Sequence, residues 1–140
     1  MTDATVRLAH LVLLAVWGGL LSAEFIVEAL ATDVAVERVV ARLHFLMDIL
    51  IELPILLGVL TTGIVLAVRA WPLTPLHWIK LSCALTAMGF NAYCAVLVVA
   101  RHRTTDDARR AALTRSIRLT GLGLPFGVAA FYLGMVYFFR

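Results

Sequence analysis

The chain has 140 residues, of which 62% are hydrophobic, and its mean hydropathy is +0.96. A soluble globular domain is roughly half apolar, so this composition excludes a soluble domain and indicates a protein whose solvent is lipid. The net charge of +3 does not indicate a nucleic-acid partner, because the arginines gather in one loop, where membrane orientation explains them. A single domain over residues 1–140 accounts for the length.

Four segments are long and apolar enough to cross a bilayer, which takes about twenty residues. We expect spans at 7–31, 41–69, 76–100 and 118–139. Pro54 interrupts the second span and should kink it. Because the connections between the first three spans are short, the sequence predicts an all-α integral membrane protein, a four-helix up-down bundle. The longer connection, 101–117, has the pattern of a short amphipathic helix at the membrane interface.

Basic residues are distributed unevenly between the two sides of this bundle. The side with the first and third connections carries Arg38, Arg42, Arg101, Arg103, Arg109, Arg110, Arg115 and Arg118. The opposite side carries Arg7, Arg69, Lys80 and Arg140. The positive-inside rule therefore predicts a bacterial inner-membrane protein with both termini on the non-cytoplasmic side. An aromatic belt at that outer interface should comprise Trp71, Trp78, Tyr137 and the terminal residues 138–140.

Polar residues recur on one face of the first span. In chain order they are His10, Trp17, Glu24 and Glu28. These positions are 7, 7 and 4 residues apart. At about 100° per residue they fall within a stripe about 40° wide. Since a charge in hydrocarbon costs at least about 2.5 kcal/mol, this face should turn to the bundle interior.

The second and third spans each have a polar face as well. The second contributes residues at i, i+4 and i+8, which are His44, Asp48 and Glu52. The third contributes residues within about 60° of one another, which are His77, Lys80 and Asn91. Depth divides all of these into an outer group and an inner group. The outer group is His10, His77 and Lys80, and the inner group is Glu24, Glu28, His44, Asp48, Glu52 and Asn91.

The two groups indicate different chemistry. Imidazole and lysine at one depth suit a haem, whose iron takes a histidine ligand and whose propionates need a cation. Carboxylates interleaved with imidazole suit a transition metal such as iron, manganese or zinc. The ligands would be Glu24, His44, Asp48 and Glu52. A proton relay through the same residues is a third possibility that needs no metal.

Each of these residues also has a purely structural interpretation. The outer histidines could contact lipid headgroups, and Arg118 could extend to the cytoplasmic surface. The deep carboxylates could form a structural ion pair with Lys80 or Arg118. Glu52 is the deepest of them, and Asp48 lies one turn away. We therefore expect Glu52 to have a positively charged partner, because the two carboxylates would otherwise repel each other.

Small residues complete the pattern. Cys83 and Cys94 lie on one predicted helix, about 16 Å apart along its axis, which is out of reach of a disulfide bond. We expect both cysteines to be small packing residues. The pair Gly18 and Gly19 should let two helices approach closely.

Two spans resemble a known family. The first contains H-L-V at 10–12 and V-W-G-G-L at 16–20, and the third contains I-K-L at 79–81 and Y-C at 93–94. These motifs resemble the corresponding helices of the HemJ-type protoporphyrinogen oxidases and, more loosely, of the CopD-type four-helix membrane proteins. The chain departs from the family pattern at Asn91, where a histidine is common, and at 122–125, where the family has N-E-x-P.

The resemblance implies a four-helix membrane protein that binds haem b and passes electrons from protoporphyrinogen IX to a membrane acceptor. His10 would stand at the position of the haem-associated histidine and Lys80 at that of the catalytic lysine. We accordingly assign the cofactor to His10, His77, Lys80 and Trp17. The alternative is a non-enzymatic metal-ion or proton pathway module, or a small subunit of a larger redox or transport complex. Either could be a homo-oligomer in the bilayer.

Overall fold

A computed structural model describes residues 2–30 and 34–138, and this part of the chain is helical throughout, without strands. The elements are α1 (Asp3–Leu30), α2 (Val34–Met47), η1 (Asp48–Glu52), α3 (Leu53–Arg69), α4 (Pro75–Arg103), α5 (Asp107–Thr120), η2 (Gly121–Gly123) and α6 (Leu124–Phe138). They form four helical stretches long and apolar enough to cross a membrane. The predicted all-α class and the number of spans are therefore confirmed.

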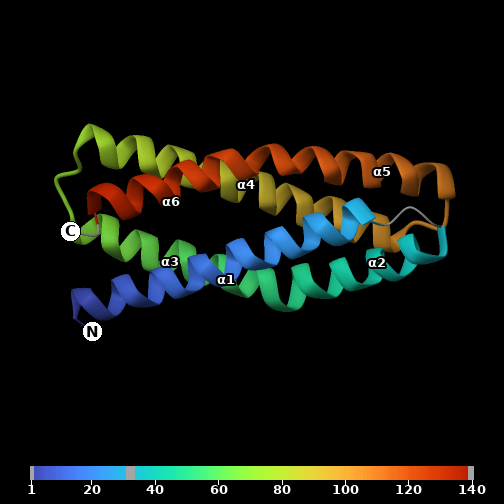
Figure 1. The fold of residues 1–140 in the computed structure, drawn as a ribbon, viewed down its shortest axis with the longest axis horizontal. Coiled ribbons are helices and arrows are strands. Elements are labelled where there is room, and N and C mark those ends of the chain that lie inside the picture. The colour runs from blue at the N-terminus through green and yellow to red at the C-terminus, as the bar shows by residue number, and fades with distance from the viewer. Residues whose placement is uncertain (1, 31–33, 139–140) are drawn as a thin grey trace.

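The four stretches run up and down along one long axis (Figure 1). α1 packs on α3 and the end of α2, while α4 packs on α5 and α6. α2 also contacts α4 and so joins the two halves. The start of α1, the end of α6 and the α3–α4 connection lie at one end of the bundle, and the α4–α5 connection lies at the other (Figure 1). This is the antiparallel order that the short connections predict.

The predicted interfacial helix at 101–117 is where the structure differs from the expectation. α4 continues to Arg103, and α5 then runs beside α4 in line with α6 (Figure 1). Asp106 caps α5, since its carboxylate accepts a bond from the Ala108 amide at 2.9 Å. Ile117 of α5 packs on Leu97 and Val98 of α4, so the apolar face of this helix meets protein rather than lipid headgroups.

Pro54 acts through a π-turn. The five residues of η1 immediately precede α3, and the Leu53 amide donates to the Asp48 carbonyl, five residues back instead of four. A proline cannot donate the regular α-helical bond and clashes with the preceding turn, which the wider π-turn relieves. The turn carries Asp48 and Glu52 into the interior, where they are only 1% and 2% exposed.

The outer surface is apolar and the tight contacts lie elsewhere than expected. A side chain added at Gly18 or Gly19 would meet nothing within 4 Å, so the expected close approach is not at this pair. Two helical segments approach closely at Gly123 instead, where an added Cβ would stand 2.6 Å from the Phe90 Cβ. Trp71 and Trp78 are exposed next to the α3–α4 connection, as an interfacial belt requires. Tyr137 is exposed near the end of α6, and residues 139–140 lie outside the described part.

Candidate metal centre

The interior contains two cavities, which separate the two predicted groups of polar residues. The inner cavity has a volume of about 680 Å³, and its polar lining includes Trp17, Glu24, Glu28, His44, Asn91, Cys94 and Arg118. The outer cavity has a volume of about 510 Å³, and its polar lining includes Arg7, His10, Arg69, His77 and Lys80. His10, His77 and Lys80 thus share one cavity, and Glu24, Glu28, His44 and Asn91 share the other. Both volumes lie in the range usual for small-molecule sites.

Four carboxylates gather beside the inner cavity. This acidic cluster consists of Glu24, Glu28, Asp48 and Glu52. All four are buried, two on α1 and two on the π-turn. The helical stripe of α1 and the i, i+4 spacing of the second span bring them together. Of the predicted metal ligands, the structure therefore collects Glu24, His44, Asp48 and Glu52 in one place.

His44 is the hub of the cluster. Its Nδ1 lies 2.7 Å from Glu28 Oε1, which is a short hydrogen bond. Its Nε2 lies on the other side of the ring, 3.3 Å from Asp48 Oδ1 and 3.6 Å from Glu24 Oε2. Glu28 therefore contacts one ring nitrogen of the imidazole, while Asp48 and Glu24 face the other.

Arg101 is the cation that sequence reasoning missed. It is 1% exposed, and its Nη2 lies 2.5 Å from Glu28 Oε1. Its Nη1 donates to Thr114 Oγ1 at 3.4 Å, and that hydroxyl donates to Glu37 Oε1 at 3.0 Å. Asn91 and Arg101 are ten residues apart, about 80° around the helix, so no spacing along α4 alone signals the contact with Glu28.

Glu52 has partners other than the expected cation. Its Oε1 accepts hydrogen bonds from Trp17 Nε1 at 3.0 Å and from Asn91 Nδ2 at 2.6 Å. Lys80, the expected partner, lines the outer cavity instead. Trp17 thus belongs with the inner cavity rather than with His10, although both residues lie on the same stripe of α1. Arg118 is exposed and donates to the Glu28 carbonyl at 3.2 Å, in the last turn of α1.

The cluster has more negative groups than positive ones. Glu24, Glu28 and Asp48 contact His44 or Arg101, and Glu52 adds a fourth carboxylate beside them. Within residues 2–30 and 34–138, neither oxygen of Asp48 accepts a hydrogen bond, and Glu24 Oε1 and Glu28 Oε2 also lack one. A buried charge without a partner is costly, and in a membrane there is no bulk water to offset it. Protons or a metal cation must therefore neutralise part of the cluster.

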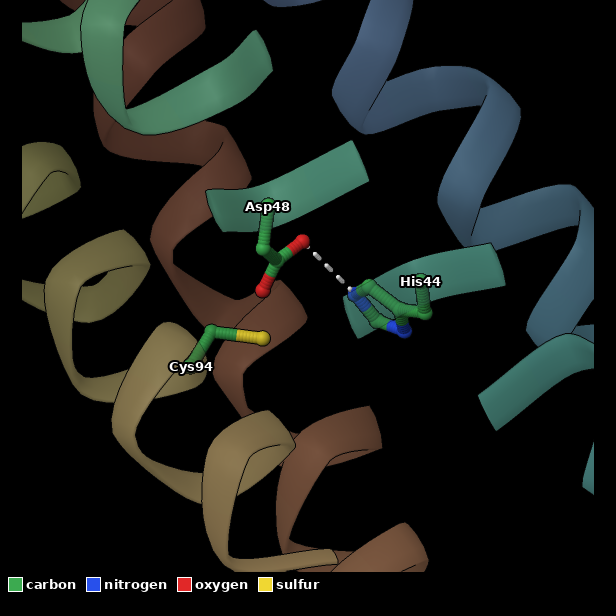
Figure 2. A group of neighbouring side chains, drawn as sticks. All are labelled: His44, Asp48 and Cys94. Atoms are coloured by element: carbon green, nitrogen blue, oxygen red, sulfur yellow. Dashed lines mark ion pairs between the residues drawn. The ribbon is translucent and has the colours of Figure 1, made fainter. Parts of the chain in front are cut away.

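Two sets of side chains place their donor atoms close enough to hold one ion. The donor atoms of Glu24, Asp48 and Glu52 all lie within 4.8 Å of one another, and so do those of His44, Asp48 and Cys94. Asp48 is common to both sets. Figure 2 shows the second set, with the Asp48 carboxylate between the imidazole and the thiol. Cys94, expected to be a packing residue, is thus part of the candidate site.

His10 and His77, which line the outer cavity, each have a threonine as hydrogen-bond partner. His10 Nδ1 lies 2.8 Å from Thr62 Oγ1, whose own proton goes to the Gly58 carbonyl at 2.7 Å. His10 is therefore the donor, and in the neutral ring Nε2 is the acceptor. His77 contributes to the cap of α4, since its Nδ1 accepts from the Thr74 amide at 3.3 Å.

Comparisons with models of protein families, with curated proteins and with solved structures find no match. The resemblance to the HemJ-type oxidases stays a prediction, and the functional argument depends on the geometry of the two cavities.

Proposed function

We propose that the protein is a membrane module that binds a divalent transition-metal ion inside its helical bundle, at Glu24, His44, Asp48 and Glu52. The observation that carries the proposal is the surplus of buried carboxylates, with Asp48 1% exposed and its oxygens without hydrogen bonds among the described residues. A cation at this point would give these oxygens the partner that a buried charge requires.

The surroundings of His44 support a metal rather than a simple ion pair. A metal-ligating histidine usually donates its second ring N–H to a carboxylate, which fixes the tautomer and the ring orientation. Glu28 is placed to accept that proton from Nδ1 at 2.7 Å. Nε2 is then the ligating nitrogen, and it faces Asp48 and Glu24. Arg101 in turn holds Glu28 in position.

The charge balance also favours a divalent ion. The four carboxylates and Arg101 leave a formal charge of −3 when His44 is neutral. A divalent cation would reduce this to −1, which one further proton on a carboxylate would cancel. Imidazole and carboxylate ligands suit iron, manganese and zinc, whereas copper(I) prefers thiolate or thioether ligands.

The location of the site sets its access. It lies towards the end of the bundle where α4 and α5 are connected, which is also the arginine-rich side. On the positive-inside rule, we place this end at the cytoplasmic face of a bacterial inner membrane and both termini on the opposite face. The module would then hold or pass metal ions near the cytoplasmic surface, alone, as a homo-oligomer or within a larger membrane complex.

Elemental analysis of the full chain tests the proposal. Protein purified in detergent from metal-supplemented cells should contain about one equivalent of iron, manganese or zinc. Asp48→Asn should lose that metal, while His10→Ala in the outer cavity should retain it. Wild-type protein with less than about a tenth of an equivalent of any transition metal would contradict a tight site.

A haem in the outer cavity is the second candidate function. The observation that favours it is His10, which lines a cavity of about 510 Å³ with Nε2 as the acceptor nitrogen that iron ligation requires. Lys80 and Arg7 line the same cavity and could pair with propionates. When bound, haem would supply one-electron chemistry, which the resemblance would direct from protoporphyrinogen IX to a membrane acceptor.

Optical spectra of the purified protein test this second candidate. A Soret band that survives purification and disappears in His10→Ala would support it, and Asp48→Asn should leave the band unchanged. A colourless protein from haem-replete cells would exclude it. The oxidase activity has a separate test. The chain should rescue a strain that lacks its protoporphyrinogen oxidase, and Lys80→Ala should abolish rescue.

A further inference from the structure

The acidic cluster includes a sulfur atom that the four proposed ligands leave unused. Cys94 projects from α4 towards the π-turn, and its Sγ lies within 4.8 Å of the donor atoms of His44 and Asp48. Figure 2 shows the three side chains converging from two helical stretches, with one Asp48 oxygen towards the imidazole and the other towards the thiol. This is the arrangement of a nitrogen, an oxygen and a sulfur around one small volume.

A second observation points to a ligand at this place. Asp48 is 1% exposed, and its Oδ1 lies 3.3 Å from His44 Nε2, but its Oδ2, on the side of the thiol, accepts no hydrogen bond from the described residues. A thiol is a weak hydrogen-bond donor and does little for a buried carboxylate. A metal ion would satisfy the carboxylate, the imidazole Nε2 and the sulfur together.

We infer that Cys94 is a thiolate ligand of the metal bound at the acidic cluster, and that the site therefore selects a zinc-like borderline ion over manganese or magnesium. The inference rests on the proposed function, which supplies the metal. Thiolate ligands favour zinc over hard cations, and zinc commonly takes cysteine, histidine and carboxylate together in a tetrahedral site. Glu24 borders this donor set, because its Oε2 lies 3.6 Å from His44 Nε2.

The binding step is balanced without a redox partner. The S–H bond of Cys94 breaks, a metal–sulfur bond forms, and the proton leaves to the buffer, while the oxidation state of the metal is unchanged. Glu52 has a different role in this arrangement. Since it accepts bonds from Trp17 and Asn91, it borders the site with Glu24 and balances charge, and the direct protein ligands are His44, Asp48 and Cys94.

Cobalt(II) substitution tests the thiolate directly. The metal-free full chain in detergent is titrated with cobalt(II) under nitrogen, and the wild type should develop a near-ultraviolet thiolate-to-cobalt charge-transfer band. Cys94→Ser should lose this band and bind zinc at least about tenfold more weakly. Cys83→Ser is the matched control, because Cys83 lies on the same helix, is also partly buried and belongs to neither donor set. It should keep both the band and the affinity.

A measurement on the wild type alone covers the case in which Cys94→Ser does not fold. X-ray absorption at the zinc edge should show a sulfur neighbour at about 2.3 Å beside nitrogen and oxygen neighbours at about 2.0–2.2 Å. Metal that binds with only nitrogen and oxygen neighbours, or a cobalt band that persists in a folded Cys94→Ser protein, would overturn the role of Cys94 and leave the proposed function standing. A protein that binds neither cobalt nor zinc would overturn the proposed function itself.

Discussion

The inner and outer cavities are of comparable volume, but the chain handles charge in them in opposite ways. Around the outer cavity the charged groups are mostly basic and lie near helix ends, and Arg69 there pairs with Asp3 at 2.6 Å while both side chains remain exposed. Around the inner cavity the charged groups are mostly acidic, and the carboxylates among them are buried. A charged side chain near a helix end is partly hydrated and needs at most one ionic partner. A charged side chain deeper in the bundle needs several partners, which come from several helices.

Removing a cation from each cavity should give the largest contrast. In metal-free protein, Arg101→Met leaves the Glu28 carboxylate buried without its cation, and we expect the free energy of unfolding to fall by about 3–5 kcal/mol. Arg69→Met breaks an exposed ion pair and should cost less than about 1 kcal/mol. Unfolding of both variants in detergent with a chelator present measures the difference. Equal losses would show that Arg101 is not the counterion of the cluster.

The next effect distinguishes the charge of Glu52 from its hydrogen bonds. Glu52→Leu leaves the Trp17 indole N–H and the Asn91 amide without their acceptor, and we expect a loss of about 2–4 kcal/mol in the free energy of unfolding. Glu52→Gln keeps an acceptor oxygen for both donors, so metal-free Glu52→Gln should unfold within about 1 kcal/mol of the wild type. Chemical unfolding of the two metal-free variants decides between them, and a glutamine variant as unstable as the leucine variant would point to a cation partner for Glu52.

A smaller effect should appear in metal affinity at the residue behind the imidazole. Glu28→Gln weakens the acceptor that orients His44, and we expect a loss of about 10–100-fold in metal affinity, or roughly 1.4–2.7 kcal/mol. Glu37→Gln is the control, since Glu37 reaches the cluster only through Thr114 and Arg101 and should cause a smaller loss. Competition titrations with a chromophoric chelator measure both variants. Unchanged affinity in a folded Glu28→Gln protein would remove Glu28 from the proposed site.

The smallest effect should come from the outer cavity. Thr62→Val removes one neutral hydrogen bond to His10 and should lower the free energy of unfolding by only about 1 kcal/mol. It should leave metal content unchanged, which elemental analysis of the same sample checks. A loss of metal in this variant would mean that the two cavities are coupled rather than independent.

The sequence predicts which residues of one helix share a face, because charges in a bilayer must turn inward and the helical repeat fixes the spacing. It did not predict the partners across helices. Arg101 was assigned to a loop because the third span was ended at residue 100, before the first arginine of that segment. The helix in fact continues to Arg103, since the buried Glu28 offers Arg101 a partner that no local pattern reveals.

Trp17 and Cys94 show the same limit in another form. Trp17 lies between His10 and Glu24 on one stripe, so its periodicity is compatible with either cavity, and only the bond to Glu52 on another helix decides. Cys94 is ambiguous because a small residue on an interior helix face is usually a packing residue. The rotation of α4 relative to the π-turn brings its thiol to Asp48, and that rotation follows from the packing of whole helices rather than from the spacing along one.

The π-turn at Asp48–Glu52 also separates the second span into two halves that serve different cavities. Residues before it, such as His44, supply the inner site, while Thr62 after it supports the outer one. Because the π-turn holds one residue more than an α-turn, deleting the exposed Leu50 to give a regular α-helix would leave His44 and Thr62 close to the faces they now occupy. The same deletion would remove the widened turn that carries Asp48 and Glu52 into the interior, so it would disrupt the acidic cluster and spare the contact between Thr62 and His10.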